Sequence, residues 1–238
     1  MKLTEKKRIG VIVAEEVELE PMTEWLSRYH KNDYTWFSHR GFSIELDQAE
    51  VLFAVSGVGK VNAAMAATDL IHRGCVVLLN FGMSGGIGHV SRGDLVLVDR
   101  CAEHDFDLTV IGYQPFEKPA QQYIYHADPQ LNQLAYDAIP GVKCGMAVSG
   151  DSFICNEEKR TELRNDFDAY SCDMETAAIA SVAFMAGIPF AALRRISDDA
   201  GEDALTEHRT MNQAVETNLT DAFCNWLLVI TKNTNKFS

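Results

Sequence analysis

Two acidic motifs have the composition and placement of a site that binds hydroxyl groups and moves protons. Asp173 and Glu175 bracket Met174 directly before an Ala-rich segment, which is typical of a helix packed closely on a sheet. Asp198 follows the apolar run 188–193, which predicts a buried strand. Ligands of open α/β sheets bind at the carboxyl ends of strands, so we expect these acids to face one pocket.

A second acidic cluster lies where the first predicted strand, residues 9–14, runs into a predicted helix. It consists of Glu15, Glu16, Glu18 and Glu20. The positive end of a helix dipole favours carboxylates, so a solvated first turn explains most of this cluster. From these residues alone, a catalytic role for one of them remains open.

Two glycine-rich segments follow predicted strands. Residues 56–60 read Ser-Gly-Val-Gly-Lys, but a Walker motif needs a glycine at Ala54 and a hydroxyl residue at Val61, which excludes nucleoside-triphosphate binding. A tight strand-to-helix turn is expected there instead. Residues 80–88 are expected to form a glycine turn, either purely structural or open to a ligand at its backbone amides. They do not fit GxGxxG, so dinucleotide binding is not expected.

Two further polar motifs, at residues 149–154 and 103–107, are considered as candidate sites. Residues 149–154 read Ser-Gly-Asp-Ser-Phe-Ile and resemble a helix start, with Phe153 either in the core or free to stack on a flat ring. This segment does not form a GxSxG elbow, which argues against a serine hydrolase here. The acids of residues 103–107 surround His104 without the spacing of known metal sites, so no metal is expected.

The bulk composition predicts one domain over residues 1–238. The chain is 47% hydrophobic, which is enough for a sizeable core. Its net charge of −13 argues against a basic face for nucleic acid. No apolar stretch has the length of a membrane span, and the charged start does not read as a signal peptide. Six cysteines without a CxxC motif are expected to be reduced thiols of a cytoplasmic protein.

Apolar runs of strand length alternate with helix-like segments. The runs predict strands over residues 9–14, 51–55, 76–81, 95–98, 145–148 and 188–193. Helices are expected over residues 17–28, 61–72, 156–165, 174–186 and 206–231. Residues 112–127, rich in tyrosine and proline, are expected to form a long irregular loop. The alternation predicts an α/β protein whose mostly parallel sheet is covered on both faces.

A larger set of motifs follows one order along the chain. It comprises residues 9–12, 18–22, 56–60, 85–86, 93–94, 104–107, 149–154, 174–175 and 196–198. In order and spacing this set resembles the 5′-methylthioadenosine/S-adenosylhomocysteine nucleosidases of the nucleoside phosphorylase superfamily, over nearly the whole chain. The resemblance implies a three-layer α/β/α sandwich with a mixed central sheet. It also implies a homodimer and no cofactor.

The resemblance assigns a role to each matching residue. Asp198 would give a proton or hydrogen bond to N7 of adenine, Glu18 would polarise the attacking water, and Arg194 would lie near that water and Glu175. The substrate would be held by a second group of residues. In that group Phe153 stacks on the base, Ile154 binds its edge through backbone groups, Met174 and Glu175 hold the ribose, and Met83 and Gly85 line the site.

Three residues depart from the pattern of this family. Glu15 stands where a methionine is usual beside the 5′-substituent, and Met83 replaces a usual serine near the water. His208 falls where the family presents an aromatic residue to the 5′-thioalkyl group. Glu15 and His208 are expected to make the 5′ pocket more polar.

The activity implied by the resemblance is hydrolysis of the N-glycosidic bond of 5′-methylthioadenosine or S-adenosylhomocysteine, with release of adenine, in methionine salvage. Alternatives are cleavage of another purine nucleoside, such as adenosine or futalosine, phosphorolysis, and an inactive nucleoside-binding protein. A phosphorylase needs cations to hold phosphate, and only Arg194 stands at a matched position, which favours water. Retention of Glu18, Glu175 and Asp198 argues against an inactive protein.

Overall fold

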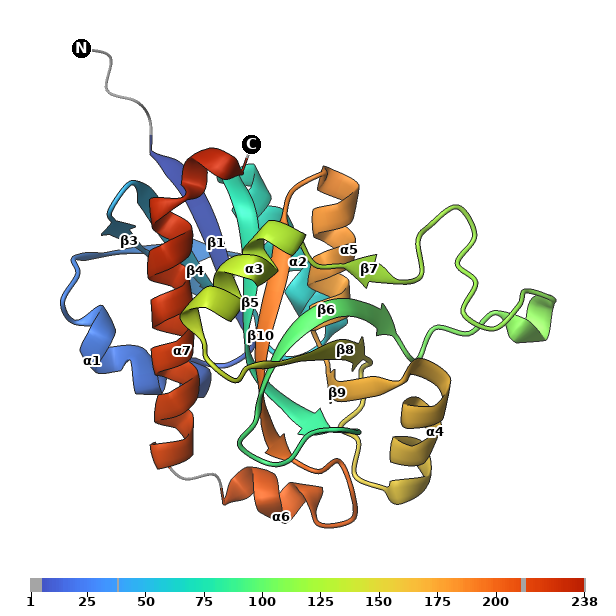
Figure 1. The fold of residues 1–238 in the computed structure, drawn as a ribbon. Helices are drawn as coiled ribbons and strands as arrows, with labels where there is room; N and C mark the ends of the chain where they lie inside the picture. Colours follow the sequence, from blue (N-terminus) through green and yellow to red (C-terminus); the bar gives the residue numbers. More distant parts are fainter. Residues whose placement is uncertain (1–5, 38, 211–212, 238) are drawn as a thin grey trace.

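Four parallel strands form the centre of the sheet that positions all other elements. The computed structural model in Figure 1 describes residues 6–37, 39–210 and 213–237. The central strands are β1 (Lys7–Val13), β4 (Ala49–Val55), β5 (Cys75–Gly86) and β10 (Phe190–Asp198). Their near-continuous burial agrees with the apolar runs, because a parallel strand covered on both faces carries few polar side chains.

Antiparallel strands extend this centre, so the sheet is mixed, as the resemblance implied, and not mostly parallel. On one side, β2 (Lys31–Trp36) and β3 (His39–Leu46) form a hairpin beside β4. On the other, β6 (Leu95–Glu103) runs antiparallel to β10 and pairs with β7 (Tyr125–His126). Then β8 (Lys143–Ser149) and β9 (Ala169–Asp173) continue the sheet. Because β5 pairs with both β10 and β9, five strands close into a ring.

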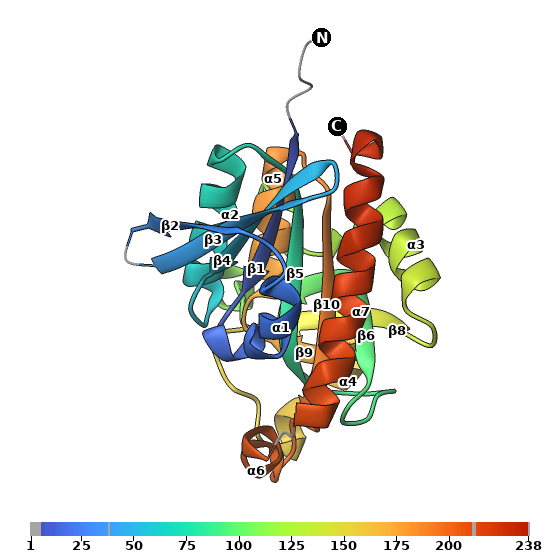
Figure 2. The ribbon, with the colours of Figure 1, turned by 90° about the vertical axis from the view of Figure 1, so that its left-hand side faces the viewer.

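Helices cover both faces of the sheet, which gives the expected three layers. One face carries α2 (Lys60–His72) and α5 (Thr176–Ala186), whose alanines pack closely on the strands. The other carries α1 (Thr23–Leu26), α3 (Pro129–Ala138) and α7 (Gln213–Lys232), as the turned view in Figure 2 shows. Helix α4 (Glu157–Phe167) packs beside β8 and β9, and α6 (Ala204–Arg209) lies below the end of β10.

The glycine turn predicted over residues 80–88 is wrong for residues 80–86, because β5 continues to Gly86. Strand β10 pairs with β5 from Leu78 to Gly85 and supplies the hydrogen bonds that keep this segment extended. A Cβ at Gly82 would lie 2.2 Å from Glu18 Oε1 and 2.9 Å from Arg194 Nη1. The glycines therefore let two charged side chains approach the strand, rather than turning the chain.

Two predicted helices are divided. The helix predicted over 17–28 is replaced by the 3-10 turns η1 (Glu16–Glu18) and η2 (Glu20–Met22) before α1. Pro21 explains the break, since it lacks an N–H and disfavours helical geometry in the residue before it. The helix predicted over 206–231 is α6 followed by α7, with residues 211–212 between them outside the described part.

The predicted irregular loop over residues 112–127 is confirmed up to β7. It follows a further 3-10 turn, η3 (Thr109–Ile111), and the chain ends after a last one, η4 (Thr234–Lys236). Within the described residues, no helix combines the length and apolarity that crossing a bilayer requires.

Candidate active site

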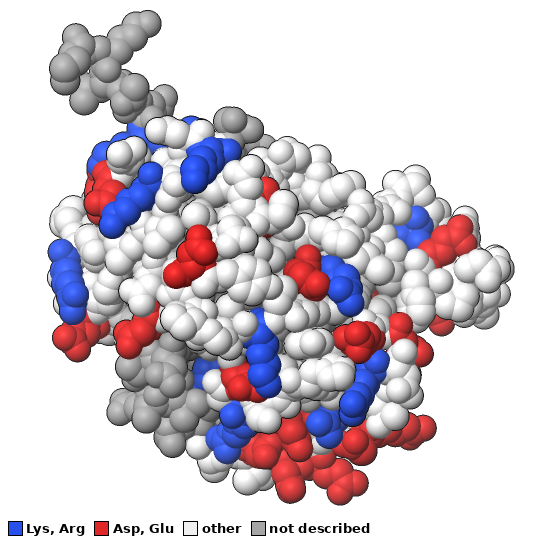
Figure 3. All heavy atoms as spheres, viewed as in Figure 1, with Lys and Arg blue, Asp and Glu red and all other residues white. Residues whose placement is uncertain are grey.

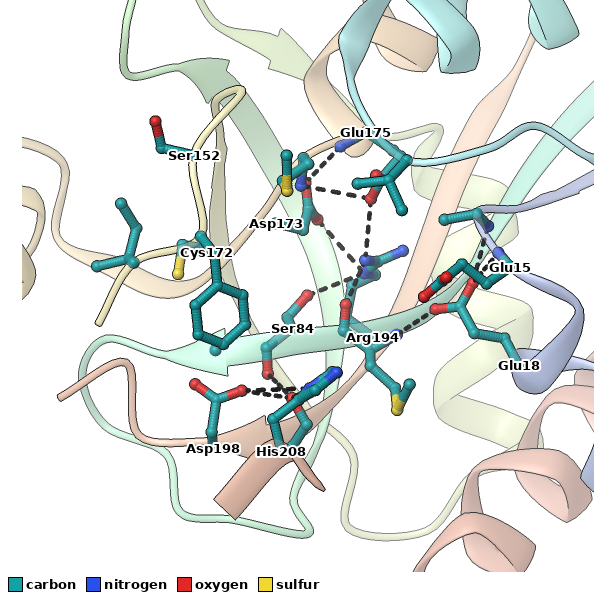
Figure 4. Close-up of a pocket in the computed structure, with 18 residues that line it drawn as sticks. Glu15, Glu18, Ser84, Ser152, Cys172, Asp173, Glu175, Arg194, Asp198 and His208 are labelled. Atoms are coloured by element: carbon teal, nitrogen blue, oxygen red, sulfur yellow. Dashed lines mark hydrogen bonds and ion pairs between the residues drawn. The ribbon is translucent and has the colours of Figure 1, made fainter. Parts of the chain in front are cut away.

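A cavity of about 160 Å³ lies where β1, β5, β9 and β10 end (Figure 4). All ten residues proposed from the sequence line it: Glu18, Met83, Gly85, Phe153, Ile154, Met174, Glu175, Arg194, Asp198 and His208. The other lining residues include Ala14, Glu15, Val58, Ser84, Ser152, Cys172, Asp173 and Ser197. The carboxyl ends of the strands therefore converge on one cavity, as the sequence predicted.

Arg194 is the buried cation at the centre of this arrangement, with 1% of its surface exposed. Its Nε donates to Ser84 Oγ at 2.9 Å, and its Nη1 donates to Asn80 Oδ1 at 3.1 Å. Nη2 donates to the backbone oxygen of Met83. The guanidinium also lies 3.3 Å from Asp173 Oδ2 and 3.6 Å from Glu175 Oε2. These partners fix the guanidinium plane at the end of β10.

Glu18 enters the cavity from the turn η1, directly after β1. Its Oε2 accepts hydrogen bonds from the backbone N–H groups of Ala14, at 2.7 Å, and Glu15, at 3.2 Å. Its Oε1 accepts from the N–H of Met83 at 2.9 Å. Burial raises the pKa of the Glu18 carboxyl above its ordinary value, although the Arg194 charge and these three amides oppose the shift.

Glu175 precedes α5 and faces the same guanidinium. Its Oε1 accepts from the N–H of Gly59 at 3.0 Å, which ties it to the turn before α2. Burial raises the pKa of Glu175 to about 7, against the nearby Arg194 charge, which lowers it. Neighbouring Asp173 is fully engaged, since its Oδ1 accepts from Ser149 Oγ at 2.6 Å and from the amides of Glu175 and Thr176 at 3.1 Å.

Asp198 ends β10 on the opposite side of the cavity and is 1% exposed. Its Oδ2 accepts from Ser197 Oγ at 2.6 Å, and its Oδ1 accepts from the N–H of Ala200 at 3.0 Å. His208, on α6, places Nδ1 3.8 Å from Asp198 Oδ2 and 3.4 Å from Ser197 Oγ. His208, which the resemblance assigns to the 5′ side of the pocket, thus also faces Asp198, the proposed acid.

An apolar wall completes the cavity. Phe153 is 45% exposed, and its ring centroid lies 5.6 Å from that of His208 in an edge-on arrangement. Ile154 is buried, and Cys172 adds a thiol whose pKa is raised by burial, so it stays neutral. Gly85 lies against Asp198, since a Cβ there would come within 3.0 Å of Asp198 Oδ1. An exposed ring above buried apolar groups is suited to a flat, largely apolar ligand.

Three loops around the cavity are joined by a charged cluster outside it. Lys60 donates from its backbone N–H to Asp151 Oδ1 at 2.8 Å and from Nζ to Asp105 Oδ1 at 2.5 Å. Asp105 Oδ2 accepts from the N–H of Asp151 at 3.0 Å. The cluster holds the turn that carries Gly59 next to the loop that carries Phe153. The acids of residues 103–107 therefore serve partly to connect loops.

Sequence reasoning missed several groups that hold the site together. Asn80 and Ser84 orient Arg194 from β5, and Thr176 donates to Asn80 Oδ1 at 2.8 Å. A buried amide inside an otherwise apolar strand was the available signal for Asn80, because such a group needs a partner. Ser84 carried no such signal, since it lies beyond the predicted strand 76–81, in the part of residues 80–88 expected to turn.

The cavity can support proton transfer to one end of a ligand and polarisation of a nucleophile at the other. Carboxylates that share a low-dielectric cleft with one cation acquire different proton affinities, so one can act as an acid while another stays ionised. Cleavage of a glycosidic bond needs this combination, together with stabilisation of an oxocarbenium-like sugar.

Comparisons with known proteins agree with this geometry. The profile of the Phosphorylase superfamily matches residues 8–227. The chain is 33% identical over 204 residues to a 5′-methylthioadenosine/S-adenosylhomocysteine nucleosidase of Anoxybacillus flavithermus, covering 82% of this chain and 87% of that protein. It is 30% identical over 203 residues to an aminodeoxyfutalosine nucleosidase of Campylobacter jejuni, covering 83% and 88%.

A solved structure shows the same similarity in three dimensions. The 5′-methylthioadenosine/S-adenosylhomocysteine nucleosidase of Neisseria meningitidis, in complex with methylthio-immucillin-A, superposes with a TM-score of 0.85 at 29% identity. The match covers 93% of this chain and 99% of that one. The chain therefore belongs to the phosphorylase superfamily and stands among its nucleosidases.

Proposed function

We propose that this protein hydrolyses the N-glycosidic bond of 5′-methylthioadenosine, S-adenosylhomocysteine or both, and releases adenine. The observation that carries the proposal is the convergence of Glu18, Glu175 and Asp198 on one cavity around the buried guanidinium of Arg194. The relatives described above supply the substrate class.

Each residue has a defined task in the proposed reaction. Asp198 protonates N7 of adenine, so the base leaves as a neutral molecule while the sugar gains oxocarbenium character. Glu18 polarises the water that attacks the anomeric carbon. Glu175 accepts hydrogen bonds from the ribose hydroxyls. Arg194 stabilises the carboxylates of Glu18 and Glu175, and the water attacks the sugar between them.

The base and sugar are held by the remaining lining residues. Phe153 stacks on adenine, and Ile154 binds its edge through the backbone. Met174 packs against the ribose beside Glu175. Met83 and Gly85 provide the strand surface beneath the sugar and the base, and His208 closes the cavity from α6.

Hydrolysis is favoured over phosphorolysis by the state of Arg194. Among the described residues that line the cavity, Arg194 and His208 carry the only basic side chains. The guanidinium already donates to Asn80, Ser84 and the Met83 carbonyl, and it faces two carboxylates. A phosphate dianion placed there would meet Glu18, Glu175 and Asp173, which repel it. Water carries no such penalty.

A second candidate substrate is an aminodeoxyfutalosine-like nucleoside. Glu15 and His208 line the cavity with polar groups where the family usually presents apolar ones. The similarity to the Campylobacter jejuni aminodeoxyfutalosine nucleosidase agrees with a polar 5′-substituent. Both candidates share the same cleavage chemistry and differ only in the group at the 5′ position.

The proposal includes a homodimer that works in the cytoplasm in methionine salvage. Large apolar side chains are exposed on neighbouring helices and on η3, which is typical of a surface buried in an assembly. They are Val61 and Met65 of α2, Phe184 and Met185 of α5, and Val110 and Ile111 of η3. All six cysteines are free thiols, as in proteins of a reducing compartment. Lys and Arg side chains are dispersed among acidic ones on the face in Figure 3, unlike a nucleic-acid surface.

Adenine release from a panel of nucleosides tests the proposal. Purified protein is incubated with 5′-methylthioadenosine, S-adenosylhomocysteine, aminodeoxyfutalosine and adenosine, and kcat/KM is measured for each. We expect the highest value for one of the first two. A highest value for aminodeoxyfutalosine would favour the second candidate, and no adenine from any substrate would favour a binding protein.

A further inference from the structure

The ring of His208 lies between solvent and the buried end of β10. Its side chain is 35% exposed, whereas that of Asp198 is 2% exposed. Nδ1 lies 3.4 Å from Ser197 Oγ and 3.8 Å from Asp198 Oδ2. Figure 4 shows the imidazole directly beside the carboxylate, on the same side of the cavity. A solvent-accessible imidazole thus lies next to a carboxyl group that water barely reaches.

Asp198 needs a proton source, because in the proposed reaction it gives its proton to the leaving base. Oδ2 accepts from Ser197 Oγ at 2.6 Å, and Oδ1 accepts from the N–H of Ala200 at 3.0 Å. An ionised carboxylate can accept both of these hydrogen bonds. An acid that gives its proton to the leaving base is left in this state after each turnover.

Ser197 is placed to pass a proton between the two groups. Its hydroxyl oxygen lies 2.6 Å from Asp198 Oδ2, 3.3 Å from the carbonyl oxygen of Ser84 and 3.4 Å from His208 Nδ1. A hydroxyl has one proton and two lone pairs, so it can accept from the imidazole while it donates to the carboxylate. Its reach to the Ser84 carbonyl gives the hydroxyl proton a second acceptor once Asp198 is protonated.

We propose that His208, through Ser197, returns a proton from solvent to Asp198 in each catalytic cycle. This inference rests on the proposed function, because it concerns the acid of that reaction. His208 is then a relay residue: it need not touch the base, and its effect on catalysis passes through Asp198.

The proton balance of the cycle closes. In the cleavage step the O–H proton of Asp198 moves to N7, and the C1′–N9 bond breaks with its electron pair going to the base. Water bonds to C1′ and gives one proton to Glu18, which releases it to solvent. The relay then shifts the Nδ1 proton of the imidazolium to Ser197 Oγ, and the Ser197 proton to Asp198. The neutral ring regains its proton from water.

Among the described residues, Asp198 is the one carboxylate that forms an ion pair with the His208 ring. The nearby charged groups of Glu207 and Arg92 have partners elsewhere. On α6 itself, Glu207 precedes the ring and Arg209 follows it, but Glu207 Oε2 accepts from the N–H of Asp199 at 3.0 Å. Arg92 reaches the outer side of α6 and donates to the Glu207 carbonyl at 2.6 Å. The loop that carries Phe153 presents an uncharged ring edge to His208.

The test compares His208→Gln with His30→Gln, a control at an exposed histidine far along the chain. Glutamine keeps a polar, hydrogen-bonding side chain but cannot transfer protons. At neutral pH we expect His208→Gln to lower kcat by about 10²-fold with little change in KM, at the lower end of the range of general acid–base catalysis. Added imidazole should restore kcat in proportion to its concentration.

Ser197 provides an independent variant. Ser197→Ala should lower kcat to a similar extent, Ser197→Thr should retain it, and Ser197→Ala with His208→Gln should be no worse than the poorer single variant. Unchanged kcat in His208→Gln, or a loss that appears only in KM and does not respond to imidazole, contradicts the relay and indicates a role in binding the 5′-group.

A measurement without substrate separates failure of the relay from failure of the proposed function. The ring ¹⁵N resonances of His208 are recorded in the wild type, Ser197→Ala and Asp198→Asn. We expect both substitutions to change them, whatever nucleoside the protein cleaves. Resonances unaffected by either substitution would overturn the relay even if the wild type releases adenine. A wild type that shows the coupling but releases no adenine contradicts the proposed reaction and with it the relay's catalytic use.

Discussion

Arg194 Nη2 lies 3.6 Å from Glu175 Oε2, with only 2% and 5% of the two side chains exposed. Opposite charges at this distance attract strongly in a poorly solvated site, but removing the carboxylate from water costs free energy as well. The desolvation is the larger effect on Glu175, since its pKa is raised to about 7 from 4.5. The proton on Glu175 therefore couples the protein's stability to pH.

The raised pKa predicts a specific loss of stability with pH. Below about pH 4.5 Glu175 is protonated in both folded and unfolded chains, and between 4.5 and about 7 the folded chain holds more protons. The free energy of unfolding should therefore fall across this window as pH rises. Glu175→Gln removes the titration, so the wild-type Tm should decline relative to the variant's between these values. Parallel Tm curves for the two proteins would contradict the burial-driven shift.

Asp198→Asn should nearly abolish turnover and leave the fold intact. The amide still hydrogen-bonds but supplies no proton, so kcat should fall at least about 10²-fold, the usual scale for a general acid. The measurement is steady-state adenine release, with a thermal melt of the variant as the control. A folded variant with near-wild-type kcat would remove Asp198 from the proposed role.

Glu18→Gln and Glu175→Gln should fail in different ways. Glu18 acts on water in the proposed reaction, so Glu18→Gln should lower kcat while nucleoside binding is kept. Glu175 accepts hydrogen bonds from the sugar hydroxyls in the proposed reaction, so Glu175→Gln should also weaken nucleoside binding. Calorimetry with a non-hydrolysable nucleoside analogue distinguishes the two variants. Binding lost in Glu18→Gln and kept in Glu175→Gln would mean that the two roles are exchanged.

The centre of the fold could be predicted from sequence because burial leaves a direct mark on composition. The apolar runs that became β1, β4 and β10 had to be covered on both faces, and the alanines of α5 had to pack closely. Strand β2 was not predictable in this way. Its Lys-Asn-Asp-Tyr-Thr-Trp sequence lies mostly exposed and becomes a strand by pairing with β3.

The residues of the candidate site could likewise be predicted only in part. Glu18, Glu175 and Asp198 were found because acids at the ends of predicted elements are expected to meet. The contact between His208 and Asp198 was not, since it depends on how α6 folds back beneath β10. The link from Lys60 to Asp105 joins loops that are far apart in the chain, and no local pattern encodes it.

Glu15 should reduce the preference for a thioether at the 5′ position. Glu15 is exposed and lines the cavity. A thiomethyl group gains about 1–3 kcal/mol from an apolar wall, and a carboxylate removes part of that gain. Glu15→Met should therefore raise kcat/KM for 5′-methylthioadenosine relative to adenosine by about tenfold or more. If the wild type already discriminates by several hundredfold and the variant does not differ, Glu15 points away from the 5′-group.

The most direct test of the account is product analysis with 5′-methylthioadenosine in phosphate-free buffer and again with added phosphate. Free adenine and reducing sugar are quantified together, and Asp198→Asn serves as the inactive control. We predict equal amounts of adenine and free methylthioribose without phosphate, and no increase in rate when phosphate is added. Adenine that forms only with phosphate, together with a sugar 1-phosphate, would contradict hydrolysis in this cavity.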